Sequence, residues 1–265
     1  MKNPYFEIIR PITSFLAALG AVIGAIISGL PFSIFYFLIF FVLFLLSSAG
    51  MVINDYYDIE IDKINAPQRP LPSGRIKRED AFIFGLFLFT LGILLSAFLN
   101  IYCFLLAIFN SLLEFLYAKH FKKGFLFGNI LVSYFTASTF LFGAFLTFDF
   151  KIIWVLSLMA FLANMGREIY KGIEDMRGDK RLKLETLPII SGKKSAKEIA
   201  QGFIALAVVL SPLPYLSGFL NSLYLRIVSI SNILFLYSFS QPPVKTKFIT
   251  KVAMYLVLLA CLLGI

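Results

Sequence analysis

Long runs of apolar residues, each ended by charged or turn-forming residues, make up most of the chain. A run of about 17–25 apolar residues can cross a bilayer as a helix. The sequence predicts nine such helices: Ile12–Ser28, Ile34–Ile53, Ala81–Leu99, Ile101–Ala118, Phe125–Leu146, Ile152–Ile169, Ile199–Leu216, Ser222–Phe239 and Phe248–Ile265. Asn100 is the expected turn between the third and the fourth. We therefore expect an all-α, polytopic membrane protein, with nine transmembrane helices bundled around a central cavity in a single domain, 1–265.

Composition and charge placement support this interpretation. The chain has 265 residues, of which 59% are hydrophobic and only 15% charged, which is too apolar for a soluble domain. A net charge of +9 could indicate nucleic-acid binding, but the basic residues are segregated. If the N-terminus is cytoplasmic, only Lys151 and Arg226 of the 24 Lys and Arg residues fall on the outer side. The pattern predicts an N-in, C-out protein of the cell membrane and no nucleic-acid partner.

A short polar stretch directly follows the second apolar run. On a helix at 100° per residue, Asn54, Asp58, Asp62 and Asp55 fall on one face, whereas Glu60 points away. Such a face is rich in hard oxygen ligands, which suit Mg²⁺ together with phosphate.

A second polar stretch follows the sixth apolar run. Here Glu168, Asp175 and Asp179 share one helical face, bordered by Arg167 and Lys171. Either stretch alone could be a solvated helix end. Two of them, on the side where basic residues dominate, favour a bound divalent cation. We expect the two clusters to face each other and to hold Mg²⁺ with a diphosphate group.

Several basic residues near these clusters are candidate phosphate ligands. Arg69 lies in the proline-stiffened loop 68–74, which could hold its guanidinium over the site. The other candidates follow Tyr117 or precede the second cluster: Lys119, Lys122, Arg167 and Lys171.

Three motifs together resemble the UbiA superfamily of intramembrane prenyltransferases. They are Asn54-Asp55-x-x-Asp58-x-x-x-Asp62, Arg69-Pro70-Leu71-Pro72-Ser73-Gly74 and Asp175-x-x-x-Asp179. The resemblance covers essentially the whole chain, because that superfamily also has nine helices and carries both Asp motifs on cytoplasmic-side loops. It implies Mg²⁺-dependent transfer of a prenyl group from an isoprenyl diphosphate to an acceptor.

The resemblance also implies roles for individual residues. Those implied to bind metal are Asn54, Asp58, Asp62, Asp175 and Asp179. The four aspartates among them and Tyr117 are the expected catalytic residues. The expected substrate-binding residues are Asn54, Arg69, Tyr117, Lys119, Lys122, Arg167 and Lys171. Many superfamily members have a lysine four residues after the tyrosine, whereas here Phe121 occupies that position. Which of Lys119 and Lys122 contacts phosphate is therefore open.

The second motif, with its flanking residues, most resembles one archaeal branch of the superfamily. Enzymes of that branch add a geranylgeranyl group to the sn-2 hydroxyl of geranylgeranylglyceryl phosphate during ether-lipid synthesis. An acceptor with its own phosphate would use cations beyond those that a Mg²⁺-bound diphosphate needs. Tyr117 and Glu114, one turn apart, could orient the acceptor hydroxyl, although Glu114 could equally form a helix–helix hydrogen bond.

Three other functions fit the sequence less well. A related enzyme with an aromatic acceptor, as in quinone or haem pathways, is only weakly disfavoured by the extra cations. A cation transporter would need charge in the helix centres, which is nearly absent. The Asp-Gly…Ala-Arg…Asp pattern that is characteristic of phosphatidyl-type transferases is absent from this sequence. The sequence leaves open the prenyl chain length, the number of Mg²⁺ ions and the oligomeric state.

Overall fold

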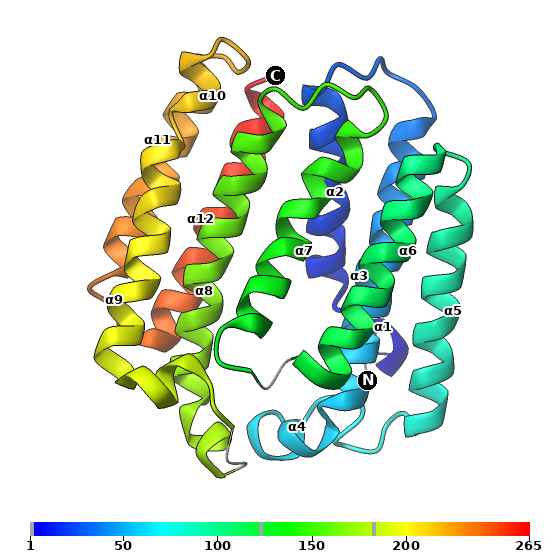
Figure 1. Ribbon diagram of the computed structural model, residues 1–265, viewed down its shortest axis with the longest axis vertical. Coiled ribbons are helices and arrows are strands. Elements are labelled where there is room, and N and C mark those ends of the chain that lie inside the picture. Colours follow the sequence, from blue (N-terminus) through cyan, green and yellow to red (C-terminus); the bar gives the residue numbers. More distant parts are fainter. Residues whose placement is uncertain (1–2, 122–123, 182–183) are drawn as a thin grey trace. The chain divides into compact units, whose positions relative to one another are not determined.

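The computed structural model describes residues 3–121, 124–181 and 184–265, and the described residues form helices and connecting turns without a strand (Figure 1). The expected all-α fold is confirmed. Backbone contacts group the chain into two compact units. The first contains Met1–Val22 and Pro31–Lys122, and the second contains Ile23–Leu30 and Lys123–Ile265.

The first unit is built around α3, which packs against α5 and α6. Its elements are α1 (Pro4–Ile8), most of α2 (Pro11–Ile27), α3 (Phe35–Tyr57), α4 (Ile59–Asn65), α5 (Arg78–Ser96), α6 (Ile101–Leu116) and the π-helical turn η1 (Tyr117–Phe121). The expected turn at Asn100 is present. Its side chain accepts a hydrogen bond from the Cys103 N–H at 2.8 Å and so caps the first turn of α6.

The second unit is built around α8, which packs against α7, α9 and α12. Its helices are α7 (Phe127–Ala144), α8 (Ile153–Arg181), α9 (Leu187–Leu210), α10 (Leu213–Leu216), α11 (Ser222–Ser238) and α12 (Pro243–Leu263). Buried side chains of α8, α9, α11 and α12 share one apolar core, in which small residues such as Ala196, Ala200 and Ala253 lie beside Tyr170 and Phe235.

Several helices have the properties of membrane spans. Within the described residues, six are long and apolar enough to cross a bilayer: Phe35–Tyr57, Arg78–Ser96, Ile101–His120, Phe127–Ala144, Leu187–Leu216 and Pro243–Leu263. Helices α2 and α11 are apolar but shorter. Eight of the nine predicted runs each coincide largely with one helix, and the seventh is divided between α9 and α10. This agreement supports a multi-pass membrane protein. The count of nine spans and the N-in, C-out orientation stay predictions.

Two helices extend well beyond the apolar runs that predicted them. The sixth run ends at Ile169, but α8 continues to Arg181 and thus carries the second polar stretch on a regular helix. Helix α9 begins at Leu187, before the seventh run, and is interrupted at Gly192, whose φ of 81° lies in the left-handed region. An apolar run marks only the lipid-compatible part of a helix, so polar turns at its ends escape detection.

Close backbone approach explains one glycine of the small-residue pair Gly20 and Gly24 in α2. A Cβ atom at Gly24 would lie 2.3 Å from the carbonyl oxygen of Phe140 in α7. The last part of α2 and α7 can therefore pack this closely only because residue 24 has no side chain. Gly24 is thus a helix-packing residue of the second unit.

We expect Gly24→Ala to destabilise the protein. The backbone of Phe140 cannot move aside as a flexible side chain could, so the overpacking should cost about 1–3 kcal/mol. Thermal unfolding of the detergent-solubilised protein measures the effect. Gly202→Ala in α9 is the matched control, because a Cβ there meets nothing within 4 Å. Equal unfolding temperatures for Gly24→Ala and wild type would contradict the packing argument.

Candidate active site

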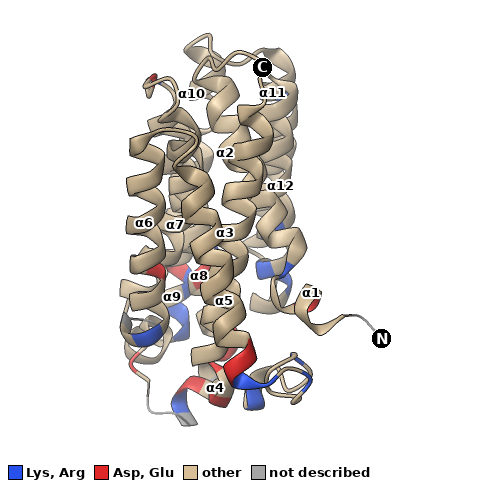
Figure 2. Ribbon diagram, turned by 90° about the vertical axis from the view of Figure 1, so that its right-hand side faces the viewer, with Lys and Arg blue, Asp and Glu red and all other residues tan. Residues whose placement is uncertain are grey.

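The first acidic cluster, defined as Asn54, Asp55, Asp58 and Asp62, lies where α3 ends and α4 begins (Figure 2). Asp58 lies at the junction between the two helices. The helical spacing of Asn54, Asp58 and Asp62 is nevertheless kept by backbone hydrogen bonds across this junction. The Asp58 N–H donates to the Asn54 carbonyl at 3.0 Å, and the Asp62 N–H donates to the Asp58 carbonyl at 2.8 Å. The three aspartates are buried and Glu60 is exposed, as the helical wheel predicted.

Arg69 binds two carboxylates of this cluster. Its Nη1 donates to Asp62 Oδ2 at 2.6 Å and lies 3.6 Å from Asp55 Oδ1. Burial by itself would lower the pKa of Arg69, but the charges of Asp55 and Asp62 outweigh it, so that the pKa is raised. The guanidinium therefore brings a permanent positive charge to the buried carboxylates.

The loop that carries Arg69 is held by its own hydrogen bonds. Ser73 Oγ donates to the Arg69 carbonyl at 2.6 Å, and the Arg75 N–H donates to the Pro70 carbonyl at 2.9 Å. Gly74 supplies the left-handed φ of 72° that the turn requires. The structure thus provides the rigid support for Arg69 that the proline-rich sequence suggested.

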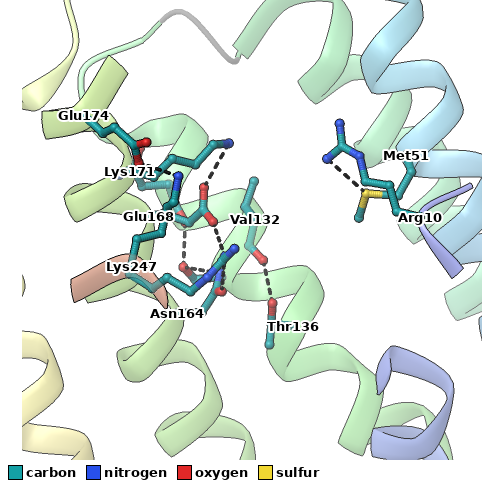
Figure 3. Close-up of polar contacts among 12 residues, drawn as sticks. Arg10, Met51, Val132, Thr136, Asn164, Glu168, Lys171, Glu174 and Lys247 are labelled. Carbon is teal, nitrogen blue, oxygen red and sulfur yellow. Dashed lines mark hydrogen bonds and ion pairs between the residues drawn. The ribbon is translucent and has the colours of Figure 1, made fainter. Parts of the chain in front are cut away.

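Arg10 is a member of this site that the sequence analysis assigned only to membrane topology. Its guanidinium forms an ion pair with Asp55 and donates to Met51 Sδ at 3.6 Å (Figure 3). Its backbone φ of 46° is left-handed, which is costly for a non-glycine residue. Asp55 is thus bound by two arginines, Arg10 and Arg69, and its carboxylate is mainly occupied with holding them.

The second acidic cluster, defined as Glu168, Glu174, Asp175 and Asp179, lies on α8. Asp179 is buried and accepts a hydrogen bond from Thr186 Oγ1 at 3.4 Å. Asp175 is half-buried. Burial raises the pKa of Asp175, and the charge of Lys171 partly offsets that rise. A cation bound at Asp175 would therefore compensate a carboxylate that the protein solvates poorly.

Among the described residues, three cations form ion pairs with the second cluster, and two of them were predicted. Arg167 Nη1 donates to Glu168 Oε1 at 2.5 Å and to Asn164 Oδ1 at 3.5 Å. Lys171 Nζ lies 3.7 Å from Glu168 Oε2 (Figure 3). Asn164 in turn donates to Ser133 Oγ at 3.4 Å, which ties the group to α7. Glu168 thus holds both predicted phosphate ligands in place.

The third cation, Lys247 of α12, was missed by the sequence analysis. It forms an ion pair with Glu174, and its charge also lowers the pKa of Asp175 (Figure 3). The helical wheel left Glu174 off the acidic face, and Lys247 was counted as a topology residue. The two residues lie far apart in sequence and meet through the packing of α12 on α8, which no local motif signals.

The candidates at the end of α6 are less tightly grouped. Tyr117 is buried at the first position of η1, whereas Lys119 of the same turn is exposed. Lys122 lies outside the described residues. A π-helical turn is rare and often marks a functional site, because it re-aims the side chains that follow.

The donor chemistry of both clusters suits Mg²⁺. The described residues contain no group of three or more His, Cys, Asp or Glu side chains arranged to hold a metal ion. Mg²⁺ in phosphate-transfer sites is commonly held by one or two carboxylates, with waters and substrate phosphate oxygens completing its shell. A dedicated cage is therefore not required, and the aspartate oxygens are the ligand type that this ion prefers.

Comparison of the sequence with known protein families identifies the family to which this fold belongs. The UbiA prenyltransferase family matches residues 14–263 of the chain. The chain belongs to this family.

Individual relatives extend the assignment within the UbiA family. The chain is 46% identical over 230 residues to digeranylgeranylglyceryl phosphate synthase of Methanosarcina mazei, covering 84% of this chain and 79% of the relative. A solved structure from work on digeranylgeranylglyceryl phosphate synthase in membranes has a TM-score of 0.79 and 41% identity, over 98% of this chain and 97% of the other. A UbiA homologue from Archaeoglobus fulgidus bound to GPP and Mg²⁺ shares the fold, with a TM-score of 0.68 and 15% identity over 99% of this chain and 100% of the other.

Family membership makes the chain a prenyltransferase. The expected resemblance to UbiA enzymes, and within them to an archaeal lipid-synthesis branch, is confirmed by these relatives. The roles of individual residues, by contrast, stay predictions.

Proposed function

We propose that this UbiA family member transfers a geranylgeranyl group from geranylgeranyl diphosphate to the sn-2 hydroxyl of geranylgeranylglyceryl phosphate in archaeal ether-lipid synthesis. The observation that carries the proposal is the match, over most of the chain, to relatives named digeranylgeranylglyceryl phosphate synthase. The cations around the two acidic clusters provide independent support, because both donor and acceptor carry phosphate.

The two acidic clusters are the proposed metal and diphosphate ligands. Asn54, Asp58 and Asp62 of the first cluster and Asp175 and Asp179 of the second would hold Mg²⁺. The bound ion supplies charge neutralisation on the departing diphosphate. Asp55 is not among the proposed ligands, since two arginines already bind its carboxylate.

The basic residues are the proposed phosphate ligands. Arg69 is presented to the first cluster by its braced loop and would bind the diphosphate. The Lys171 side chain is 40% exposed, and its Nζ lies 3.7 Å from Glu168. It can move to a phosphate because Arg167 would still neutralise Glu168. Arg167 beside it, together with Lys119 and Lys122 after α6, would complete the set that binds the phosphates of donor and acceptor.

The reaction follows from this arrangement. Departure of the diphosphate leaves an allylic cation, and an acceptor hydroxyl held at near-attack distance captures it. The prenyl tail would lie along apolar helices, which keep out water that would otherwise quench the cation. Tyr117, buried at the start of η1, is the proposed catalytic residue that helps to orient the acceptor.

The proposed topology follows from charge segregation. Nine spans with a cytoplasmic N-terminus would place nearly all basic residues, and both acidic clusters, on the cytoplasmic side of the cell membrane. Water-soluble head groups of both substrates would then meet the enzyme at that surface.

An acceptor assay tests the proposal. Purified protein with labelled geranylgeranyl diphosphate and Mg²⁺ is given geranylgeranylglyceryl phosphate or 4-hydroxybenzoate, the latter representing the aromatic acceptors of quinone pathways. We expect a labelled lipid phosphate with the first acceptor and no product with the second. Parallel reactions with EDTA should give no product with either acceptor. Transfer to the aromatic compound alone would overturn the lipid assignment and leave prenyl transfer intact.

A further inference from the structure

Glu114 carries a carboxyl group inside the membrane-spanning part of the first unit. It lies on α6, one turn before Tyr117. Its carboxyl group contacts α3 at Gly50, where a Cβ atom would lie 1.8 Å from Oε1 and 2.4 Å from Oε2. Both oxygens therefore point at a buried position of α3 that can accept them only because it has no side chain.

The Glu114 carboxyl group has no polar partner in the parts of the chain that the structure describes. No hydrogen bond or ion pair reaches it there. This differs from the aspartates of the first cluster, where Asp55 and Asp62 are bound by arginines. The helix–helix hydrogen bond considered from the sequence is thus not made within the described residues. An unpaired carboxyl group within a membrane span is costly, which favours a role in binding a ligand.

The position of Glu114 suits a contact with the acceptor hydroxyl. Gly50 precedes Asn54 of the first cluster by one turn of α3, about 6 Å along the helix axis. A donor whose diphosphate binds at the cluster would send its prenyl tail into the apolar part of the helices. Its reactive carbon C1 would then pass at the level of the Glu114 carboxyl group, one turn deeper than the phosphates.

We propose that Glu114 binds the acceptor hydroxyl and takes its proton, an inference that rests on the proposed function. The hydroxyl oxygen forms a bond to C1 of the prenyl group, and the bond from C1 to the diphosphate oxygen breaks. The diphosphate leaves with the electron pair of that bond. The hydroxyl proton moves to the Glu114 carboxylate, which later returns it to solvent. Glu114 is therefore a catalytic residue for capture and not for departure of the diphosphate.

Two variants of Glu114 test this role. Glu114→Gln keeps the shape and a hydrogen-bond acceptor but cannot take the proton, and Glu114→Leu removes both functions. We expect kcat for transfer to fall about 10–100-fold in the first, in the range of a lost general base, and further in the second. Release of diphosphate to water, measured without the acceptor, should stay within twofold of wild type in both. Glu79→Gln, at an exposed position in the first turn of α5, is the matched control.

Stability separates this proposal from a structural role. Removing an unpartnered carboxyl group should leave the unfolding temperature unchanged or raise it, whereas loss of a helix–helix hydrogen bond would lower it. Wild-type transfer in both variants, or equal losses of transfer and of diphosphate release, would overturn the role of Glu114. Failure of wild-type protein to prenylate the lipid acceptor would instead refute the proposed function, which the same assay reports separately.

Discussion

Asp58→Ala and Asp175→Ala should each lower prenyl transfer by about 1,000-fold or more. Each variant removes a carboxylate that is proposed to hold Mg²⁺ against the leaving diphosphate. Metal stabilisation of such a leaving group contributes several kcal/mol, and about 4 kcal/mol corresponds to a 1,000-fold change in rate. Single-turnover formation of labelled lipid product, measured over a series of Mg²⁺ concentrations, would quantify the loss.

Matched controls exist for both variants. Glu60→Ala removes an exposed carboxylate close to Asp58 in sequence, and Glu185→Ala removes one after the second cluster. Both controls should keep transfer within about threefold of wild type, because an exposed charge contributes little through water and salt. Because Asp58 and Asp175 belong to different compact units, losses of similar size would mean that both clusters serve one reaction. Full activity in either aspartate variant would exclude that aspartate as a metal ligand.

The fold was largely predictable because the bilayer imposes a simple requirement on sequence. A spanning helix must be apolar over the whole thickness of the bilayer core, so its position in the sequence appears as an uninterrupted apolar run. The junction at Asp58 shows where this reasoning ends. The apolar run stops before it, and only the structure shows that α3 ends at Tyr57 while the backbone hydrogen bonds continue into α4.

The candidate site was predictable where its residues are near neighbours in sequence. Helical spacing grouped Asp58 with Asp62, and a proline-rich loop indicated Arg69. Arg10 and Lys247 could not be found in this way. Arg10 reaches the first cluster from the turn between α1 and α2, and Lys247 reaches the second from α12. Basic residues near the ends of membrane helices also have an ordinary explanation in topology. The sequence indicates Glu114 as a candidate, but its lack of a polar partner among the described residues is a property of packing that no sequence pattern reports.

Arg69→Met should both destabilise the protein and weaken diphosphate binding. Removing the guanidinium leaves Asp62 buried without its 2.6 Å partner and leaves Asp55 with Arg10 alone. Breaking a fully buried pair costs about 3–5 kcal/mol. The Arg69 side chain is 32% exposed, so solvent screening reduces the expected cost to about 2–3 kcal/mol. Thermal unfolding in detergent measures the stability loss, and KM for geranylgeranyl diphosphate should rise about tenfold.

A double-mutant cycle separates the two effects of Arg69. Asp62→Asn in the Arg69→Met background removes the uncompensated charge, so it should recover at least half of the lost stability. It should not recover donor binding, because neither the guanidinium nor the proposed metal ligand is restored. Lys77→Met, an exposed cation just before α5, is the control for simple loss of positive charge. A normal KM in the double variant would mean that neither the Arg69 guanidinium nor the Asp62 carboxylate is needed to bind the donor. Recovery of stability in the double variant, together with a raised KM in Arg69→Met itself, would mean that the same guanidinium neutralises the buried cluster and binds the donor diphosphate.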